Sequence, residues 1–385
     1  MSRPRPWEII VRLLEPRGAV RMTVAALGDV GLVGSARERA RREGVDAAFA
    51  ALKPALSAAD LRFANLEMPF GDADWIEPGR TAEFWQDDAV AGGLARAGVQ
   101  VVSVANNHAM DCGPRGLLRT LESCKAAGLL AVGAGANLEA ARQPARLEVR
   151  GQRVVVLAYA ATHGDAAGAD RAGVAPLEGD LIREDLMRWR SAADVLIVSA
   201  HWGTMYVDYP PPRVIELARA IEAQGADLVL GHHPHVLQGF QRHGRGLTLF
   251  SLGESAFNSR AGDFHATLAS ELRRESAVFT ATLAEEPGLD LDPLWLDVDG
   301  FPTPADPATA ARIRERMLRI STRIEEASER YFSESAPQVV GYELEKLGHY
   351  VRQGRLDKIV RMLGTFRPRH VPMLWHAVRR GARFR

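Results

Sequence analysis

Histidines cluster directly after a short apolar run near residue 230. The β-forming residues Leu228–Leu230 lead into a glycine, and His232, His233 and His235 follow within four residues. A strand that ends in a glycine turn can aim two imidazoles at alternate positions toward one point. Core histidines usually occur singly, so this cluster favours metal ligation over a histidine-rich polar turn. The pattern predicts His233 and His235 as ligands and gives His232, which alternation turns away, a supporting or structural role.

Four more polar clusters follow apolar runs elsewhere in the chain. The residues concerned are Asp29 after 23–27, Asn65 and Glu67 after 61–64, Asn107, His108 and Asp111 after 99–104, and His201 after 195–200. Open α/β sheets place their ligands at the carboxyl ends of strands. We therefore expect these side chains to converge with the histidine cluster on one site.

Each of these residues also has a plainer interpretation. Asp29 could cap the turn that follows it, Glu67 could be a surface carboxylate, and Asn107 could be a helix N-cap. Their common placement at strand ends favours ligation. His108, next to Asn107, suits a general acid or an oxyanion stabiliser better than a further ligand.

The donor types indicate which ions could bind. Imidazoles, carboxylates and an amide oxygen suit Zn²⁺, Mn²⁺ or Fe more than Ca²⁺ or Mg²⁺. The number of donors exceeds what one tetrahedral ion needs, so two divalent transition-metal ions that share a bridging carboxylate fit better. Such a centre is typical of enzymes that hydrolyse phosphoesters or amides.

Short apolar runs and amphipathic segments alternate along the chain. Helical spacing predicts helices over 45–57, over 89–97, around 117–124 and over 214–224, with glycines at 98, 128 and 225 as stops. Strands that alternate with helices argue for an α/β layered fold whose strands are mostly buried. This arrangement would bring the carboxyl ends of the strands, and the polar clusters, to one edge.

Length and composition set broader limits. The 385 residues are 46% hydrophobic with zero formal net charge, which provides a sizeable core and no basic surplus for a nucleic-acid partner. No apolar run approaches the roughly 18 residues of a membrane span, and no signal-peptide h-region follows the basic N-terminus. We expect a cytoplasmic protein. The Pro-rich segment 301–307 predicts a linker, which divides the chain into an extension (1–22), a main domain (23–300) and a helical, basic C-terminal extension (301–385).

The C-terminal tail is strongly basic. Residues 351–385 contain ten Arg or Lys and one Asp, and Arg367–Arg380 interleaves basic residues with Leu374 and Trp375. Such a segment could contact an anionic membrane surface or a partner protein. A solvated basic helix packed on the domain is the interpretation we favour.

With these residues assembled, the chain resembles the CapA family of bacterial capsule and poly-γ-glutamate synthesis proteins, which belong with the calcineurin-like metallophosphatases. The resemblance runs from about residue 23 to 258. Its motifs are Gly28-Asp29, Asn65-Leu-Glu67, Asn106-Asn-His-Ala-Met-Asp111-Cys-Gly113, His201-Trp-Gly203, Gly231-His-His-Pro-His-Val-Leu-Gln238 and Ser251-Leu-Gly253.

The resemblance implies a four-layer α/β/β/α metallophosphatase-like sandwich with a dinuclear site at the sheet edge. Asp29, Glu67 and His235 would hold one metal. Glu67 would bridge to a second metal, bound also by Asn107, His201 and His233. His108 would match the catalytic histidine, with Asp111 beside it. Supporting or substrate-contacting roles would fall to Asn65, Asn106, Trp202, His232 and Glu254.

Two departures from the usual motifs stand out. Metallophosphatases usually have Asp-x-His in the first motif, whereas Gly31 stands here where the histidine would be. The family usually continues Ser-Leu-Gly-Asn-Phe, whereas Glu254 follows Gly253 here. A carboxylate at that position adds negative charge near the site, and it could ligate a metal or alter substrate choice.

Three functions are compatible with these observations. The first, which we favour, is a metal-dependent hydrolase acting on a phosphoester or a γ-glutamyl or peptide amide of a small-molecule, peptide or polymer substrate. The second is a metal-assisted peptide epimerase that removes a Cα proton. The third is a non-catalytic accessory protein of capsule or exopolysaccharide assembly.

Overall fold

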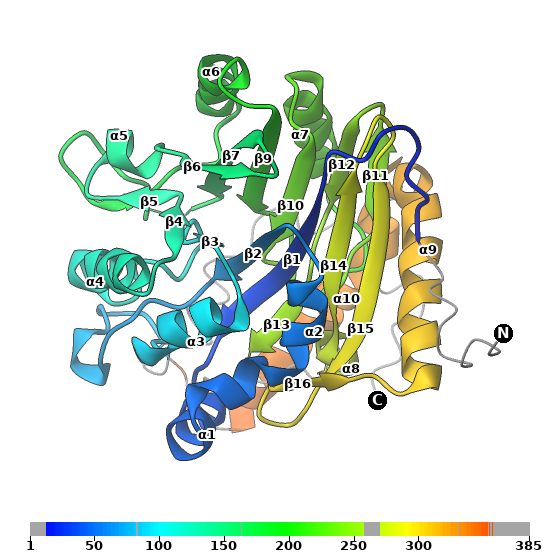
Figure 1. The fold of residues 1–385 in the computed structure, drawn as a ribbon. Coiled ribbons are helices and arrows are strands. Elements are labelled where there is room, and N and C mark those ends of the chain that lie inside the picture. The colour runs from blue at the N-terminus through cyan, green and yellow to red at the C-terminus, as the bar shows by residue number, and fades with distance from the viewer. Residues whose placement is uncertain are drawn as a thin grey trace, which may run out of the picture.

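The computed structural model describes residues 13–81, 84–162, 164–257, 270–329, 331–352, 354 and 356. Its centre is two mixed β-sheets that pack face to face, with helices on both outer faces (Figure 1). This four-layer α/β/β/α sandwich is the predicted fold class.

The first sheet has the strand order β16-β15-β14-β1-β2-β3-β4, and β13 pairs separately with β1. Strands β1 to β4 are mutually parallel, while β14, β15 and β16 continue the sheet in antiparallel pairs. The bounds are β1 (Met22–Gly31), β2 (Leu61–Leu66), β3 (Val101–Ser103), β4 (Leu130–Val132), β13 (Glu254–Phe257), β14 (Glu275–Leu283), β15 (Gly288–Leu296) and β16 (Pro302–Pro304).

The second sheet has the order β11-β12-β10-β9-β7-β6. Its four inner strands are parallel and its two edge strands are antiparallel. The bounds are β6 (Ala145–Val149), β7 (Gln152–Ala160), β9 (Val195–His201), β10 (Leu228–His232), β11 (Phe240–His243) and β12 (Gly246–Leu249); β5 (Ala134–Gly135) and β8 (Gly173–Val174) form a small separate ladder.

Helices cover the two outer faces. On the side of the first sheet lie α1 (Ser35–Glu43), the 3₁₀ helix η1 (Val45–Leu52), α2 (Lys53–Ser57), η2 (Ala73–Trp75), α3 (Ala89–Ala97) and α4 (Gly113–Ala126). The remaining helices are α5 (Leu138–Ala141), α6 (Gly179–Arg190), α7 (Pro212–Ala223), α8 (Ser270–Arg274), α9 (Pro307–Glu329) and α10 (Tyr331–Arg352). No helix within the described residues has both the length and the apolarity needed to cross a bilayer.

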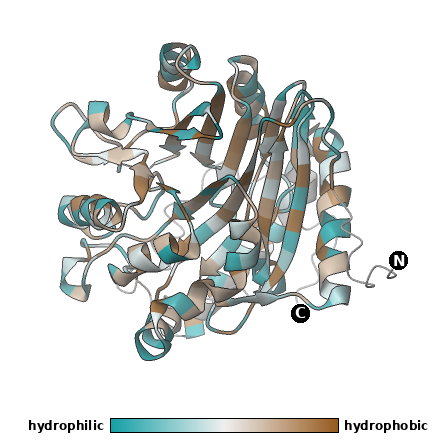
Figure 2. Ribbon diagram, viewed as in Figure 1, coloured by the Kyte–Doolittle hydropathy of each residue, from teal (hydrophilic) through white to brown (hydrophobic). Residues whose placement is uncertain are grey.

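Strand β10 shows how the alternation of side chains builds this core. Leu228 and Leu230 belong to the hydrophobic cluster between the sheets, whereas Val229 packs in a second cluster with residues of α6, α7 and α9. Both faces of the strand are therefore apolar, as expected for a parallel sheet covered on both sides. Figure 2 shows the resulting concentration of hydrophobic residues along the central strands.

The expected helix over 45–57 is only partly correct. The segment folds as η1 and then α2, with Pro54 in the first turn of α2. Proline has no backbone N–H and cannot continue an α-helix from the preceding turn, so a new helix begins there. The other three predicted helices are confirmed as α3, α4 and α7.

The segment 301–307 is more than a linker. Its residues Pro302–Pro304 form β16, which pairs with β15 at the edge of the first sheet, where proline is tolerated. Beyond it, Ile313 and Met317 of α9 belong to the main hydrophobic cluster. The division of the chain at residue 300 stays a prediction. Arg367–Arg380 lies outside the described residues, so its membrane or protein contact stays a prediction too.

Candidate metal centre

Asp29 lies at the carboxyl end of β1, between the two sheets. The pairing of β1 with β2 shifts register between Ala26 and Asp29, and irregularities of this kind are common beside functional sites. The Asn65 side-chain amide donates to Asp29 Oδ1 over 2.8 Å, and His232 Nδ1 lies 3.3 Å from the same oxygen. Burial alone would raise the pKa of Asp29, but the contact with His232 and the nearby His235 leave it lowered.

Glu67 directly follows β2 and is fully buried. Neither of its carboxylate oxygens accepts a hydrogen bond from the part of the chain that the structure describes. Burial, and then the neighbouring carboxylates Asp29 and Glu254, raise the pKa of Glu67 well above its usual value. Its Oε1 lies 3.7 Å from both His201 Nε2 and His235 Nε2. The negative charge of Glu67 is thus uncompensated by the protein around it, and a bound cation would compensate it.

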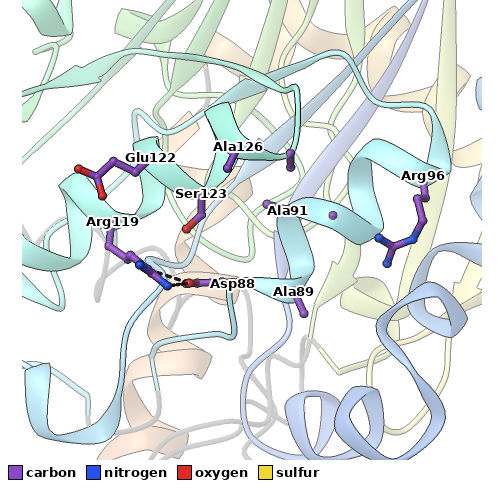
Figure 3. Close-up of a pocket in the computed structure, with 10 residues that line it drawn as sticks. Asp88, Ala89, Ala91, Arg96, Arg119, Glu122, Ser123 and Ala126 are labelled. Atoms are coloured by element: carbon purple, nitrogen blue, oxygen red, sulfur yellow. Dashed lines mark hydrogen bonds and ion pairs between the residues drawn. The ribbon is translucent and has the colours of Figure 1, made fainter.

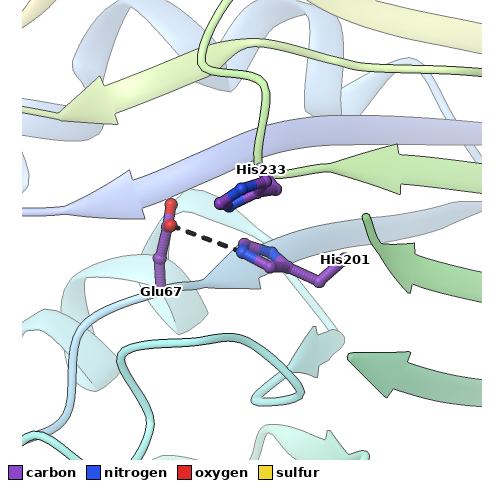
Figure 4. Close-up of side chains that lie close together, drawn as sticks. All are labelled: Glu67, His201 and His233. Atoms are coloured by element: carbon purple, nitrogen blue, oxygen red, sulfur yellow. Dashed lines mark ion pairs between the residues drawn. The ribbon is translucent and has the colours of Figure 1, made fainter. Parts of the chain in front are cut away.

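His201 ends β9, opposite His232 of β10 in the sheet register. Burial and the adjacent His233 hold the pKa of His201 well below its usual value. The imidazole is therefore neutral at neutral pH, which is the form that binds a metal. Figure 4 shows Glu67, His201 and His233 turned toward one another from three different strand ends.

His233 and His235 have an unusual backbone conformation. Their φ angles are 97° and 57°, in the left-handed region that non-glycine residues rarely adopt. Each such residue costs about 1–3 kcal/mol, and such strain concentrates at functional sites. The loop after β10 thus holds both imidazoles in place at a cost in stability.

The ligand atoms fall into two groups. One consists of Glu67, His201 and His233; the other consists of Asp29, Glu67 and His235. Within each group the atoms lie within 4.8 Å of one another, and Glu67 belongs to both. This partition matches the one implied by the resemblance, although the individual ligand roles stay predictions.

The residues present fit two divalent cations that share Glu67. The buried carboxylate of Glu67 has no hydrogen-bond donor among the described residues and needs a counter-charge when it is ionised, and the three imidazoles favour transition metals over Ca²⁺ or Mg²⁺. Asn107, the sixth predicted ligand, lies beside the first group, with its Oδ1 2.6 Å from His201 Nε2.

His108 forms a close pair with Asp111 at the edge of this cluster. His108 Nδ1 lies 2.7 Å from Asp111 Oδ2, and His108 Nε2 lies 3.0 Å from the side-chain amide of Asn107. The His108 ring also packs edge-on against Phe84, with 4.8 Å between ring centroids. Asp111 can therefore orient the ring, while Nε2 lies against the side chain of Asn107, which itself contacts His201.

The other predicted site residues have supporting positions. Asn106 joins two loops, because its amide donates to Leu66 O and its Oδ1 accepts from the His108 backbone N–H. Trp202 is buried, and its indole N–H donates to the Phe250 carbonyl at 3.0 Å. These contacts stabilise the loops that carry the site and leave little for a ligand to contact.

The structure explains why residue 31 is glycine. A Cβ at this position would lie 2.6 Å from the Phe257 ring and 2.9 Å from Met68 Cγ. The Phe257 ring packs against His235, with 5.2 Å between centroids. Space that a larger first-motif residue would need is therefore filled by Phe257.

Sequence reasoning missed three residues near the site. Arg80 pairs with Asp111 Oδ1 at 3.2 Å and also with Asp165. Tyr206 and Arg273 lie against His235 and Glu254 respectively. None of the three stands in a motif or at the end of a predicted strand, so only their tertiary contacts reveal them.

A hollow of about 530 Å³ lies elsewhere, between α3 and α4 (Figure 3). Its lining includes Asp88, which pairs with Arg119, and Arg96, which pairs with Asp46. None of the predicted site residues contributes to this lining, so the hollow is separate from the candidate metal centre.

The fold and the donor set together define a four-layer α/β protein with a candidate two-metal centre between its sheets. The chain belongs to the bacterial capsule synthesis protein family PGA_cap, whose model matches residues 23–259. The family predicted from the motifs is thereby confirmed.

Named relatives agree with this assignment. The capsule biosynthesis protein CapA of Bacillus anthracis is 30% identical over 247 residues, covering 62% of this chain and 60% of that protein. The PGA biosynthesis protein CapA of Bacillus subtilis is 28% identical over 241 residues, covering 62% and 63%. A probable polyglutamine synthesis accessory protein of Mycobacterium tuberculosis is 30% identical over 186 residues, covering 45% and 49%. The chain thus spans less than two thirds of the length of these relatives.

Proposed function

We propose that this protein is a metal-dependent hydrolase that cleaves a phosphoester or a γ-glutamyl-type amide bond. The observation that carries the proposal is Glu67, a buried carboxylate that belongs to two groups of ligand atoms at once. A shared carboxylate between two ions is the usual basis of two-metal hydrolysis. The His108–Asp111 pair beside these groups supports the same reaction class.

Two divalent ions held by Asp29, Glu67, His201, His233 and His235 would supply Lewis acidity that activates water and offsets negative charge on the substrate. The proton transfers fall to His108. Its Nδ1 is occupied by Asp111, so a proton would be taken up or released at Nε2, the nitrogen that lies 3.0 Å from the Asn107 side-chain amide. The carboxylate beside Nδ1 fixes the ring orientation, which holds Nε2 in place for proton transfer to a leaving group.

The names of the relatives support a polymer-related substrate. They refer to capsule, PGA and polyglutamine synthesis. A γ-glutamyl amide of such a polymer is one substrate class, and a phosphoester of its precursors or carriers is the other. Both reactions need the same water activation and the same leaving-group protonation, so the site serves either.

A second candidate is a non-catalytic accessory role, which the printed name of the mycobacterial relative favours. In that case the metal ions would stabilise the fold or bind polymer without turnover. The His108–Asp111 pair would then contribute nothing to pathway function. This difference separates the two candidates.

The test uses Mn²⁺-loaded protein with p-nitrophenyl phosphate, bis(p-nitrophenyl) phosphate and γ-glutamyl p-nitroanilide as substrates. We expect turnover of at least one of them. His108→Gln should lower kcat by about 10²- to 10⁴-fold with unchanged metal content, because it removes the proton-transfer group and no ligand. His243→Gln is the matched control. His243 lies on the edge strand β11 and pairs with Glu222 of α7, so this variant should leave kcat unchanged.

The outcome that contradicts the hydrolase is two bound ions with no turnover of any substrate. Wild-type pathway function in the His108→Gln variant would then support the accessory role. Solvent deuterium at a peptide Cα without cleavage would instead indicate the epimerase.

A further inference from the structure

Glu254 and Arg273 form a buried ion pair beside His235. Glu254 begins β13 and lies opposite Asp29 in the register with β1. Its Oε1 lies 3.3 Å from His235 Nδ1 and 3.4 Å from Arg273 Nη2. Glu254 is 1% exposed and Arg273 is 5% exposed, so both charges are removed from water.

Fold stability alone does not account for this ion pair. A buried ion pair contributes little net stability, because desolvation of both charges offsets their attraction. Glu254 is moreover a third carboxylate near Asp29 and Glu67. The repulsion between these negative charges destabilises the fold further. Such an arrangement suggests a function that depends on the carboxylate.

The two nitrogens of His235 face different partners. Nε2 faces the shared carboxylate, 3.7 Å from Glu67 Oε1, whereas Nδ1 lies 3.3 Å from Glu254 Oε1 and 3.5 Å from Asp29 Oδ2. Glu254 does not belong to either group of ligand atoms found among the described residues. Its position is that of a carboxylate behind a ligating imidazole, an arrangement that fixes the tautomer and the orientation of the ring.

Arg273 packs in turn against the aromatic ring of Tyr206. Its guanidinium lies 4.7 Å from the centroid of the Tyr206 ring. The Tyr206 ring packs against His235 at 5.9 Å and against Tyr342 of α10 at 4.9 Å between centroids. Arg273 and Tyr342 lie beyond the family match, which ends at residue 259. This support for His235 therefore depends on parts of the chain that the family model does not cover.

We propose that Glu254, held by Arg273, is a positioning residue that directs His235 Nε2 toward the ion bound with Asp29 and Glu67. The inference rests on the proposed metal centre. It assigns a role to the carboxylate that replaces the usual asparagine of the motif. Glu254 acts through Nδ1 of the ring and not as a ligand.

The experiment is a Mn²⁺ titration of chelator-treated, full-length protein by isothermal calorimetry, with wild type and Glu254→Gln compared. We expect the affinity of one of two ions to fall about 10- to 100-fold and that of the other to stay unchanged. Glu222→Gln is the matched control. Glu222 is also a largely buried carboxylate paired with a histidine, His243 Nδ1 at 2.9 Å, and both ions should bind this variant as in wild type.

Two further measurements separate positioning from a structural effect. The visible ligand-field bands of the Co²⁺-loaded protein should shift in Glu254→Gln and not in Glu222→Gln. The double variant Glu254→Gln/Arg273→Met removes both buried charges, so it should fold even if the single variant leaves Arg273 unpaired and unstable. The double variant should show the same selective loss of affinity.

The outcomes are distinguishable. Two ions bound with wild-type affinity in both variants would overturn this inference and leave the hydrolase intact. Complete loss of one ion in both, at millimolar Mn²⁺, would make Glu254 a ligand and also overturn it. A wild-type protein that binds no ion would overturn the inference together with the proposed function.

Discussion

The two ligand groups that share Glu67 differ in composition. The group with His201 and His233 has two imidazoles, with the Asn107 amide beside it. The group with Asp29 and His235 has one imidazole and two carboxylates, and Glu254 lies behind it. One side of the centre is therefore rich in nitrogen and lies next to His108, whereas the other is rich in oxygen and more negative. Under the proposed function, we expect the first group to take part in the reaction and the second mainly to bind its cation.

The comparison of the two ligand groups depends on Glu67 binding an ion in each of them. Glu67→Gln keeps the shape of the side chain but removes the charge that both groups share. We expect both ions to be lost and activity to fall more than about 100-fold, beyond the cost of an altered supporting residue. Elemental mass spectrometry after gel filtration measures the metal content. Retention of a full equivalent would show that one side binds without Glu67.

Removing one imidazole from each side sharpens the comparison. His201→Ala and His235→Ala should each lose one ion, but different ones. When Zn²⁺ and Mn²⁺ compete, the nitrogen-rich group that remains in His235→Ala should prefer Zn²⁺. The oxygen-rich group that remains in His201→Ala should bind Mn²⁺ relatively better, because imidazole favours zinc and carboxylate favours manganese. Titrations of each variant with both metals test this. Identical preferences in the two variants would contradict the assigned difference.

The smallest expected effect concerns backbone strain. Asparagine tolerates the left-handed conformation better than histidine, so His233→Asn relieves part of the strain at φ 97°. We expect the metal-free variant to be as stable as wild type or more stable, by up to about 1 kcal/mol, although metal binding is weakened. Thermal unfolding in chelator measures this. A clear loss of stability would show that His233 supports the fold itself.

Local sequence patterns predicted the helices and strands well where the residues of the element itself determine its structure. The run Leu228–Leu230 before a glycine, and the helix that ends at Gly98, follow from hydrophobic period and stop signals. The segment 45–57 and the strand Pro302–Pro304 did not, because proline changes the first and pairing with the preceding strand β15 creates the second. Strand partners depend on tertiary contacts that a local pattern cannot encode.

The same distinction applies to the site. Residues at strand ends, such as Asp29 and His201, were predictable because parallel strands bring their carboxyl ends together. Arg273 and Tyr206 were not. Tyr206 packs against His235 from an irregular segment, and Arg273 contacts Tyr206 from the short helix α8, and neither segment has a pattern of its own. Motifs in the sequence thus predict the ligand groups, whereas the residues that pack around the ligands are identified only by their tertiary contacts.

The strand order of the first sheet has a consequence for how the protein acquires its shape. Residues Met22–Ala26 of β1 pair with β14, whose partner residues Phe279–Leu283 come more than 250 positions later. Such a distant contact makes closure of the sheet slow, because a long loop must be ordered first. During synthesis, the edge of β1 that pairs with β14 would stay unpaired until β14 has been synthesised. A chain ended at residue 259 would keep the family motifs and still lack this neighbour, so we expect it to aggregate through the exposed edge of β1.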